Sequence, residues 1–214
     1  MKFDSGRWQL AQYAELKWWR RYLKNQNPTE YLRWKKNYWA GFFENTGFEV
    51  SPVEKILEVG CGPAGAFIFF DQNDVVALDP LLENYQKFLP HFQAEKYPKT
   101  RFLSQPFENT DFQEYFDLIL CLNVINHVGN LDFFVKKLYS TLRPGGRMLL
   151  STDVHNFLIF KKLFQIIPGD ILHPQQFSLN DYLDVLRAAG FKIEKTTFLK
   201  HSFFFDYWAV EARK

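Results

Sequence analysis

Hydrophobic and polar positions divide most of this chain into short apolar runs separated by segments of helical spacing. This alternation over residues 55–152 is typical of a parallel sheet whose strands are joined by crossover helices. The apolar runs predict strands near 55–60, 75–79, 101–104, 116–122 and 146–152. The segments between them predict helices near 64–71, 81–93 and 131–142. The pattern therefore indicates an α/β fold.

The C-terminal part continues with a different pattern. A helix is expected near 155–166, and a second one begins after a Ser178 N-cap and ends at Gly190. Two strands near 191–199 and 204–212 follow, with a tight return between them. These two strands are expected to form an antiparallel pair at the edge of the sheet.

Residues 1–50 are rich in aromatic and basic side chains and show helical spacing only. A first stripe consists of Trp8, Leu16, Trp19 and Leu23, with Gln12 interrupting it. After a turn at Asn27-Pro28, a second helix is expected to present Tyr31, Trp34, Tyr38 and Phe42 along one face. We expect residues 1–50 to form a helical cap or lid and residues 51–214 to form the main domain. An RNA-binding arm is the alternative, because aromatic platforms with cations suit single strands.

Composition narrows the class of protein. The 214 residues are 47% hydrophobic and 23% charged with a net charge of +2, which is ordinary for one globular domain and gives no global signal for nucleic acid. Cys61 and Cys121 end apolar runs and are expected to be buried, reduced thiols, and no cysteine spacing predicts a metal site. The first residues lack a signal-peptide core and no apolar run could span a membrane, so the expected location is cytoplasmic.

A glycine turn after the first strand is the strongest chemical signal. Gly60 and Gly62 permit backbone angles that a Cβ forbids, and the helix expected near Ala64 would direct its free amides into the same space. Asp79 lies 19 positions after Gly60, at the end of the second strand, where it could accept hydrogen bonds from ribose hydroxyls. The arrangement predicts an adenosine-containing cofactor.

Four segments, in order, resemble the motifs of class I S-adenosylmethionine-dependent methyltransferases of the small-molecule branch. Residues 58–65 (Glu-Val-Gly-Cys-Gly-Pro-Ala-Gly) are similar to the first motif, and residues 116–128 to the fourth strand and the loop beside the methyl group. Residues 142–147 and 173–178 match the fifth-strand entry and the C-terminal part. The resemblance implies a Rossmann-like, seven-stranded, mostly parallel sheet of order 3-2-1-4-5-7-6, with strand 7 antiparallel and helices on both faces.

The resemblance also implies which residues bind the cofactor. The implied set is Glu58, Gly60, Cys61, Gly62, Asp79, Pro80, Leu81, Phe107, Glu108, Asn123 and Val124. Two positions depart from the family pattern. Ala64 stands where a third glycine is frequent, and Gln105-Pro106 replaces the acid that often follows the third strand, with Glu108 as a substitute.

The implied activity is in-line transfer of a methyl group to an oxygen, nitrogen or carbon acceptor on a small molecule, leaving S-adenosylhomocysteine. His127 is the candidate base, and ordering of its own loop is the alternative role. Gln12, Trp19, His173 and His201 are candidate substrate contacts. Deleting residues 1–45 is expected to abolish turnover without unfolding the protein. The open alternatives are an RNA or protein methyltransferase that uses the basic N-terminal helices, and a non-catalytic cofactor-binding subunit.

Overall fold

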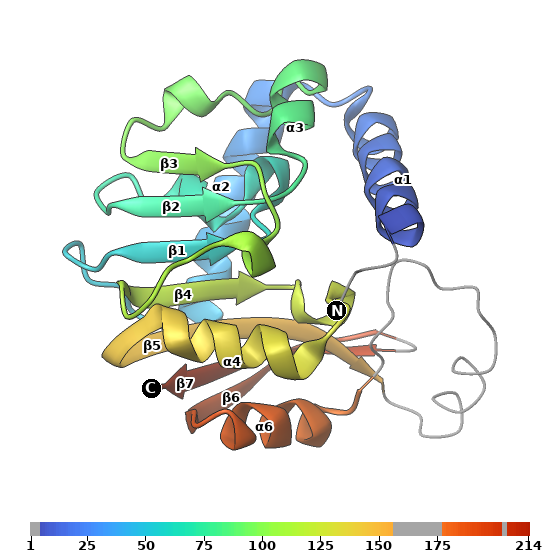
Figure 1. Ribbon diagram of the computed structural model, residues 1–214. Coiled ribbons are helices and arrows are strands. Elements are labelled where there is room, and N and C mark those ends of the chain that lie inside the picture. The colour runs from blue at the N-terminus through green and yellow to red at the C-terminus, as the bar shows by residue number, and fades with distance from the viewer. Residues whose placement is uncertain (1–4, 156–176, 203–204) are drawn as a thin grey trace. The chain divides into compact units, whose positions relative to one another are not determined.

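The computed structural model describes residues 5–155, 177–202 and 205–214. Over these residues seven strands form a sheet in the order β3-β2-β1-β4-β5-β7-β6 (Figure 1). The strands are β1 (Ile56–Val59), β2 (Val75–Leu78), β3 (Thr100–Leu103), β4 (Phe116–Leu122), β5 (Leu142–His155), β6 (Lys192–His201) and β7 (Phe205–Arg213). β1, β2 and β3 pair in parallel, as do β4 and β5, whereas β7 is antiparallel to both β5 and β6. The strand order and the antiparallel seventh strand expected from the sequence are confirmed.

The helices also follow the sequence pattern in most places. The α-helices are α1 (Ser5–Leu23), α2 (Pro28–Thr46), α3 (Leu82–Phe88), α4 (Leu131–Thr141) and α6 (Leu179–Ala188). Asn27 caps α2 by accepting from the amides of Thr29 and Glu30, and Ser178 forms a capping box with Asp181 at α6. The helix expected near 155–166 lies outside the described residues.

Two helix predictions need correction. The helix expected over 64–71 is wrong: the structure has two 3₁₀ turns, η1 (Gly62–Ala64) and η2 (Ala66–Phe69). The Glu58 carboxylate accepts hydrogen bonds from the backbone amides of Ala66 and Phe67, so a side chain satisfies the amides at the start of this segment. The helix expected over 81–93 is shorter than predicted, because Pro90 holds the residue before it in an extended conformation.

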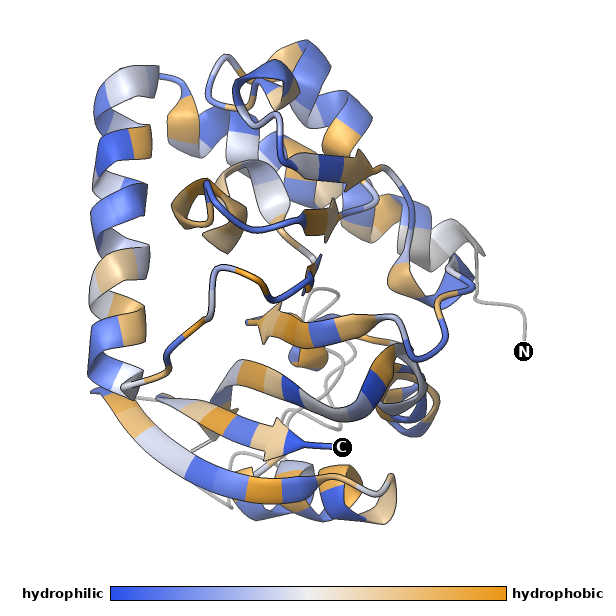
Figure 2. Cartoon of the chain, turned by 90° about the vertical axis from the view of Figure 1, so that its left-hand side faces the viewer, coloured by the Kyte–Doolittle hydropathy of each residue, from blue (hydrophilic) through white to orange (hydrophobic). Residues whose placement is uncertain are grey.

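Strand burial explains why the sheet was recognisable. All seven residues of β4 are buried, as expected for a central parallel strand, while the edge strand β6 has several exposed residues. In Figure 2 the most strongly hydrophobic colours lie on the short strands in the middle of the sheet, whereas the helices and the strands at the bottom of the view alternate hydrophobic and hydrophilic bands. Continuous apolar runs therefore identify the centre of the sheet and alternating ones its covering layers.

The chain divides into two compact units, Met1–Thr110 and Asp111–Lys214. In the first unit α2 packs on η2, and its Phe43 ring stacks on Phe69 with 5.5 Å between centroids. The buried face of α2 carries Tyr31, Trp39, Phe42, Phe43 and Thr46. The predicted face was wrong for Trp34 and Tyr38, which are 52% and 39% exposed. The sequence did not distinguish the buried face of α2, because aromatic residues lie on all sides of this helix.

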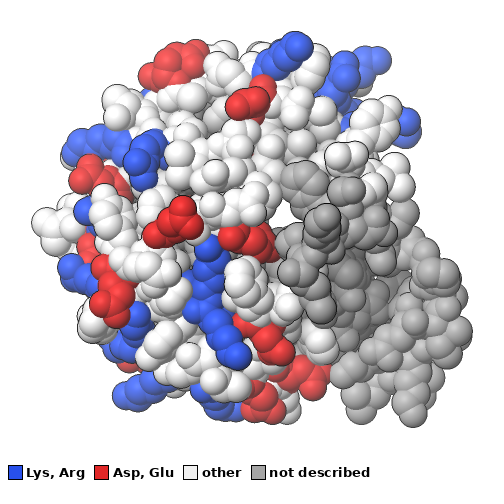
Figure 3. Space-filling view, in the orientation of Figure 1, with Lys and Arg blue, Asp and Glu red and all other residues white. Residues whose placement is uncertain are grey.

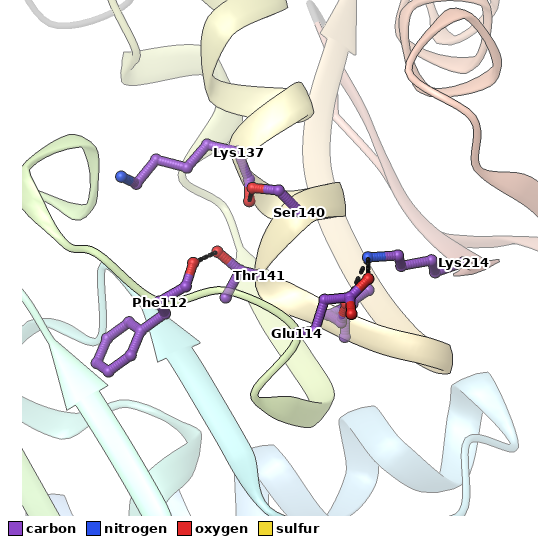
Figure 4. Close-up of polar contacts among 7 residues, drawn as sticks. Phe112, Glu114, Lys137, Ser140, Thr141 and Lys214 are labelled. Carbon is purple, nitrogen blue, oxygen red and sulfur yellow. Dashed lines mark hydrogen bonds and ion pairs between the residues drawn. The ribbon is translucent and has the colours of Figure 1, made fainter.

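The second unit contains β4 to β7 with α4 and α6. α4 lies in front of β4 and β5 in Figure 1, and α6 packs against β6 and α4. The last residue ties the start of β5 in place: Lys214 Nζ donates to the Leu142 carbonyl oxygen at 2.8 Å and lies 3.1 Å from Glu114 Oε1 (Figure 4). Thr141 Oγ1 donates to the Phe112 carbonyl oxygen at 3.3 Å in the same region. These bonds secure the junction from which β5 extends.

Candidate functional site

The glycine turn after β1 is fixed to the end of β2 by backbone hydrogen bonds. Gly60 and Gly62 have φ values of +66° and +56°, which an L side chain rarely adopts. The amides of Gly60 and Cys61 both donate to the Leu78 carbonyl oxygen, at 2.8 and 3.1 Å. The turn therefore lies directly beside Asp79, the residue that follows Leu78.

Asp79 is buried and faces the turn. Its Oδ2 accepts from the Gly62 amide at 3.1 Å, and its Oδ1 accepts from the Leu81 amide at 2.8 Å. Burial and, to a smaller extent, the charge of Glu15 raise the pKa of Asp79 to about 7 against the opposing effect of the two amide hydrogen bonds. Each oxygen keeps a second lone pair, so the carboxylate can still accept from hydroxyl groups of a ligand.

Glu58 shapes the turn from inside the fold. Its oxygens accept from the Ala66 and Phe67 amides at 2.6 and 2.7 Å. Burial raises the pKa of Glu58 to about 7, even though these two hydrogen bonds and the charge of Lys35 act in the opposite direction. An ideal Cβ at Gly65 would lie 2.5 Å from the Cys61 carbonyl oxygen and closer still to Glu58 Oε1. Only glycine fits at position 65.

Both N-terminal helices contact this turn. On α1, Trp19 Cζ2 lies 3.7 Å from the position of a Cβ at Gly62. On α2, the Trp39 indole Nε1 donates to the Ala64 carbonyl oxygen at 3.2 Å. Within the first unit, the aromatic helices are thus in direct contact with the segment predicted to hold a cofactor.

Three residues that sequence reasoning missed lie here: Glu15, Trp39 and Tyr85. The hydroxyl of Tyr85, a fully buried residue of α3, donates to Glu15 Oε1 at 3.2 Å. One sequence signal could have found Glu15, since it is the only acidic residue among the 19 residues of the aromatic and basic α1. Trp39 and Tyr85 carry no such signal, because buried aromatics occur throughout this chain.

The other predicted cofactor residues of the first unit follow β1, β2 and β3. Leu81 is buried and Pro80 is half-buried after β2, and on η4 (Phe107–Asn109) Phe107 is buried and Glu108 half-buried. Cys61 is buried in the turn as a free thiol, and burial raises its pKa well above the usual value. The same unit thus brings together the predicted residues that follow β1 and β2 around one turn.

In the second unit, the backbone at the end of β4 adopts an unusual conformation. Asn123 has φ of +59° and is exposed, and its amide donates to the Ser151 carbonyl oxygen at 2.8 Å. A non-glycine residue in the left-handed region stores strain, and such residues cluster at functional sites. Val124 is half-buried, and His127 is exposed at the end of η5 (Ile125–His127). The backbone after β4 thus presents Asn123 and His127 on the surface of this unit.

The four candidate substrate contacts have different surroundings. Trp19 lies against the glycine turn and Tyr85, and Gln12 lies two turns earlier on α1 with a buried Oε1. His201 is exposed near the end of β6 and pairs with Asp206, at 2.6 Å between Nδ1 and Oδ1. His173 lies outside the described residues. The structure therefore places Gln12 and Trp19 on the helix that contacts the glycine turn, whereas His201 pairs with a residue of the neighbouring strand β7.

The sheet order, the glycine turn after β1 and the carboxylate after β2 together define the class I methyltransferase fold. Residues 31–196 match the family model of a methyltransferase domain, and the chain belongs to this family. Over 116 residues, 51% of this chain, it is 32% identical to a ubiquinone biosynthesis O-methyltransferase of Rickettsia conorii, covering 38% of that protein. It is 27% identical over 213 residues to phosphoethanolamine N-methyltransferase 3 of Arabidopsis thaliana, covering 86% of this chain and 41% of that protein.

A solved structure shares the fold over almost the whole chain. The 1,6-didemethyltoxoflavin-N1-methyltransferase of Burkholderia thailandensis superposes with a TM-score of 0.66 at 18% identity, over 98% of this chain and 88% of the other. The chain spans less than half the length of the curated relatives described above. Among the described residues, no helix is long and apolar enough to cross a membrane, and no group of three or more His, Cys, Asp or Glu could hold a metal ion.

Proposed function

We propose that this protein is an S-adenosylmethionine-dependent methyltransferase that methylates an oxygen or nitrogen atom of a small molecule. The observation that carries the proposal is Asp79, a buried carboxylate at the end of β2 that faces a turn with two positive-φ glycines. The fit is supported by lone pairs left on the Asp79 oxygens and by the buried, unpartnered Oε1 of Gln12. Both are acceptors that a polar ligand with hydroxyl and ammonium groups would satisfy.

The residues of this chain would have separate tasks. Asp79 would hold the ribose, the Gly60–Gly62 turn the methionine part, and Pro80, Leu81, Phe107 and Glu108 the adenine side, with Asn123 and Val124 contributing from the end of β4. The cofactor would supply an electrophilic methyl group on a positively charged sulfur. The helices of residues 1–50 would act as a cap that aligns the reactants and excludes water. His127 would accept the proton of the acceptor.

The acceptor class is supported by two relatives of this chain. The relatives described above are an O-methyltransferase of ubiquinone biosynthesis and a phosphoethanolamine N-methyltransferase. We therefore favour a small acceptor with a phenolic oxygen or an amine nitrogen. We also propose a cytoplasmic location.

Calorimetric titration with S-adenosylhomocysteine tests the cofactor assignment. The Asp79→Ala variant should bind at least about tenfold more weakly, because a buried ribose loses charge-assisted hydrogen bonds. Asp71→Ala is the matched control, since Asp71 is an exposed aspartate of the same unit. Equal affinities of the two variants would remove Asp79 from the site, and no binding by the unaltered protein would overturn the proposal.

A panel of phenols and primary amines tests the reaction, with S-adenosylhomocysteine formation as the readout. Cofactor binding without turnover on any acceptor, together with a co-purifying protein, would favour the non-catalytic subunit. With an active acceptor, His127→Ala should lower kcat by about 100-fold or more without changing cofactor affinity. His201→Ala is the control, and an equal effect of both would assign His127 to loop ordering.

The RNA alternative retains one supporting observation. Trp18 and Tyr22 on α1 are 53% and 43% exposed, and their rings stack with 4.9 Å between centroids and 6° between planes. Exposed stacked rings next to Arg20 and Arg21 suit single-stranded bases. Against this reading, cationic and anionic side chains are interspersed on the face drawn in Figure 3. A steep loss of RNA affinity with added salt would support the alternative.

A further inference from the structure

One face of α1 brings polar groups to the predicted cofactor site. Gln12, Glu15 and Trp19 are spaced i, i+3 and i+7, so they lie on the same side of the helix. Trp19 contacts the glycine turn, as described above, and its ring lies 6.4 Å from that of Tyr85, between centroids. Glu15, between Gln12 and Trp19, accepts the Tyr85 hydroxyl hydrogen bond at 3.2 Å. The carboxylate of Glu15 is therefore held on the side of α1 that faces α3 and the turn.

Hydrogen bonds connect Glu15 to Asp79 through Tyr85 and Leu81. The Tyr85 hydroxyl donates to Glu15, the Tyr85 amide donates to the Leu81 carbonyl oxygen at 2.8 Å, and the Leu81 amide donates to Asp79 Oδ1. Burial raises the pKa of Glu15, against hydrogen bonds from Tyr85 and Trp19, and the charge of Glu15 contributes to the raised pKa of Asp79. Within the described part of the chain, neither carboxylate forms an ion pair with a Lys, Arg or His side chain. Gln12 Oε1, on the same side of α1 as Glu15, is a buried oxygen acceptor without a hydrogen-bond partner. The face of α1 beside the turn therefore presents the Glu15 carboxylate and an unpartnered Gln12 acceptor close to the Asp79 carboxylate.

We propose that Glu15, together with Asp79 and Gln12, forms an anionic subsite that selects the cationic cofactor over its neutral product. The inference rests on the proposed function and extends it to ligand discrimination. In S-adenosylmethionine the sulfonium is one methylene from the ribose ring that Asp79 would bind, so a second carboxylate near Asp79 acts on that charge. A cation relieves the repulsion between the half-buried Glu15 carboxylate and the buried Asp79 carboxylate, whereas a neutral ligand leaves the repulsion in place.

Methyl transfer changes the charge that this subsite detects. The lone pair of the acceptor atom forms the new bond to the methyl carbon, and the carbon–sulfur bond breaks with its electron pair staying on sulfur. The sulfonium becomes a neutral thioether, and the acceptor loses its proton to a base. The product therefore no longer offsets the Glu15 and Asp79 charges, and its release is favoured.

Calorimetric titration of the full chain with S-adenosylmethionine and with S-adenosylhomocysteine, at one pH near 8, tests the subsite. The unaltered protein should bind the methionine form more tightly. The Glu15→Gln variant should bind S-adenosylmethionine about tenfold more weakly, an effect as large as a pKa shift of about one unit. Its affinity for S-adenosylhomocysteine should stay within about threefold of that of the unaltered protein. The ratio of the two affinities is the readout, and a purely structural role of Glu15 would weaken both ligands equally.

Two further variants separate charge from tethering. Tyr85→Phe removes the hydroxyl partner but keeps the Glu15 carboxylate, so the affinity ratio should stay as in the unaltered protein. Glu30→Gln removes an exposed acid from α2 and serves as the matched control. The inference is overturned if Glu15→Gln leaves the ratio of the two affinities unchanged. It is also overturned, without any variant, if the unaltered protein binds S-adenosylhomocysteine as tightly as S-adenosylmethionine or more tightly. Failure of the unaltered protein to bind either ligand would instead overturn the proposed function.

Discussion

The indole of Trp39 donates a hydrogen bond to the carbonyl oxygen of Ala64, and this bond joins helix α2 to the glycine turn. Trp39 is 7% exposed, so the bond lies in a largely dry environment, where leaving a carbonyl unpaired is costly. The N-terminal segment is for this reason part of the structure that shapes the predicted cofactor site.

Replacing this indole should therefore lower both stability and ligand affinity. We expect Trp39→Phe to lose about 1–3 kcal/mol of unfolding free energy and to bind S-adenosylhomocysteine more weakly, measured by urea denaturation and calorimetry. Trp34→Phe is the control, because Trp34 is on the same helix and half-exposed. Its stability should change by less than about 0.5 kcal/mol. Similar losses for both variants would contradict a specific role for the Trp39 bond.

Gly65 offers a test of the packing behind the turn. Gly65→Ala would place a methyl group against Glu58 and the Cys61 carbonyl oxygen, so a loss of about 1–3 kcal/mol of stability is expected. Gly41→Ala provides a matched control, since an added Cβ at Gly41, inside α2, meets no atom within 4 Å. That variant should gain about 0.5–1 kcal/mol from helix propensity. If both substitutions changed the unfolding free energy in the same direction, the predicted clash at Gly65 would be contradicted.

The raised pKa of Asp79 predicts a pH dependence of stability. Its folded pKa of about 7 exceeds the ordinary value of 3.8, so the folded state holds more protons between these values. This contribution is fully present below pH 4 and is lost as the pH rises through 7, by at most about 4 kcal/mol. Urea titrations across this range should show a shallower decline for Asp79→Asn than for the unaltered protein. Asp71→Asn should keep the original slope, and equal slopes for all three proteins would contradict the prediction.

Truncation should separate the two N-terminal helices. The sequence led us to expect that residues 1–45 could be deleted without unfolding, but that deletion removes the buried Trp39, Phe42 and Phe43. We now expect a chain starting at Phe48 to lack a cooperative thermal transition in circular dichroism. A chain starting at Leu23 should fold cooperatively and bind S-adenosylhomocysteine more weakly, since Trp19 no longer covers Gly62. Unchanged affinity in this shorter truncation would exclude α1 from the site.

The sequence alone predicted where the strands lie, because fully buried strands such as β4 are continuous apolar runs with turn signals at both ends. The order of the strands came from the resemblance to class I methyltransferases. The sequence also predicted the positive-φ glycines and the place of Asp79, since these depend on local backbone chemistry and fixed spacing. The helix predicted after the turn was wrong because Gly65 is extended between the two 3₁₀ turns and interrupts the helical backbone. Glu58 stabilises this conformation by accepting from the Ala66 and Phe67 amides.

Only the tertiary structure decided what surrounds the turn. Which aromatic rings of α1 and α2 are buried depends on their partners in the fold, so Trp39 is enclosed while Trp34 is exposed. The meeting of Glu15 with Tyr85, 70 residues later, likewise leaves no periodic trace in the chain. Local patterns determine secondary structure and turn geometry. Long-range packing determines which charges are desolvated, and the character of this site depends on those charges.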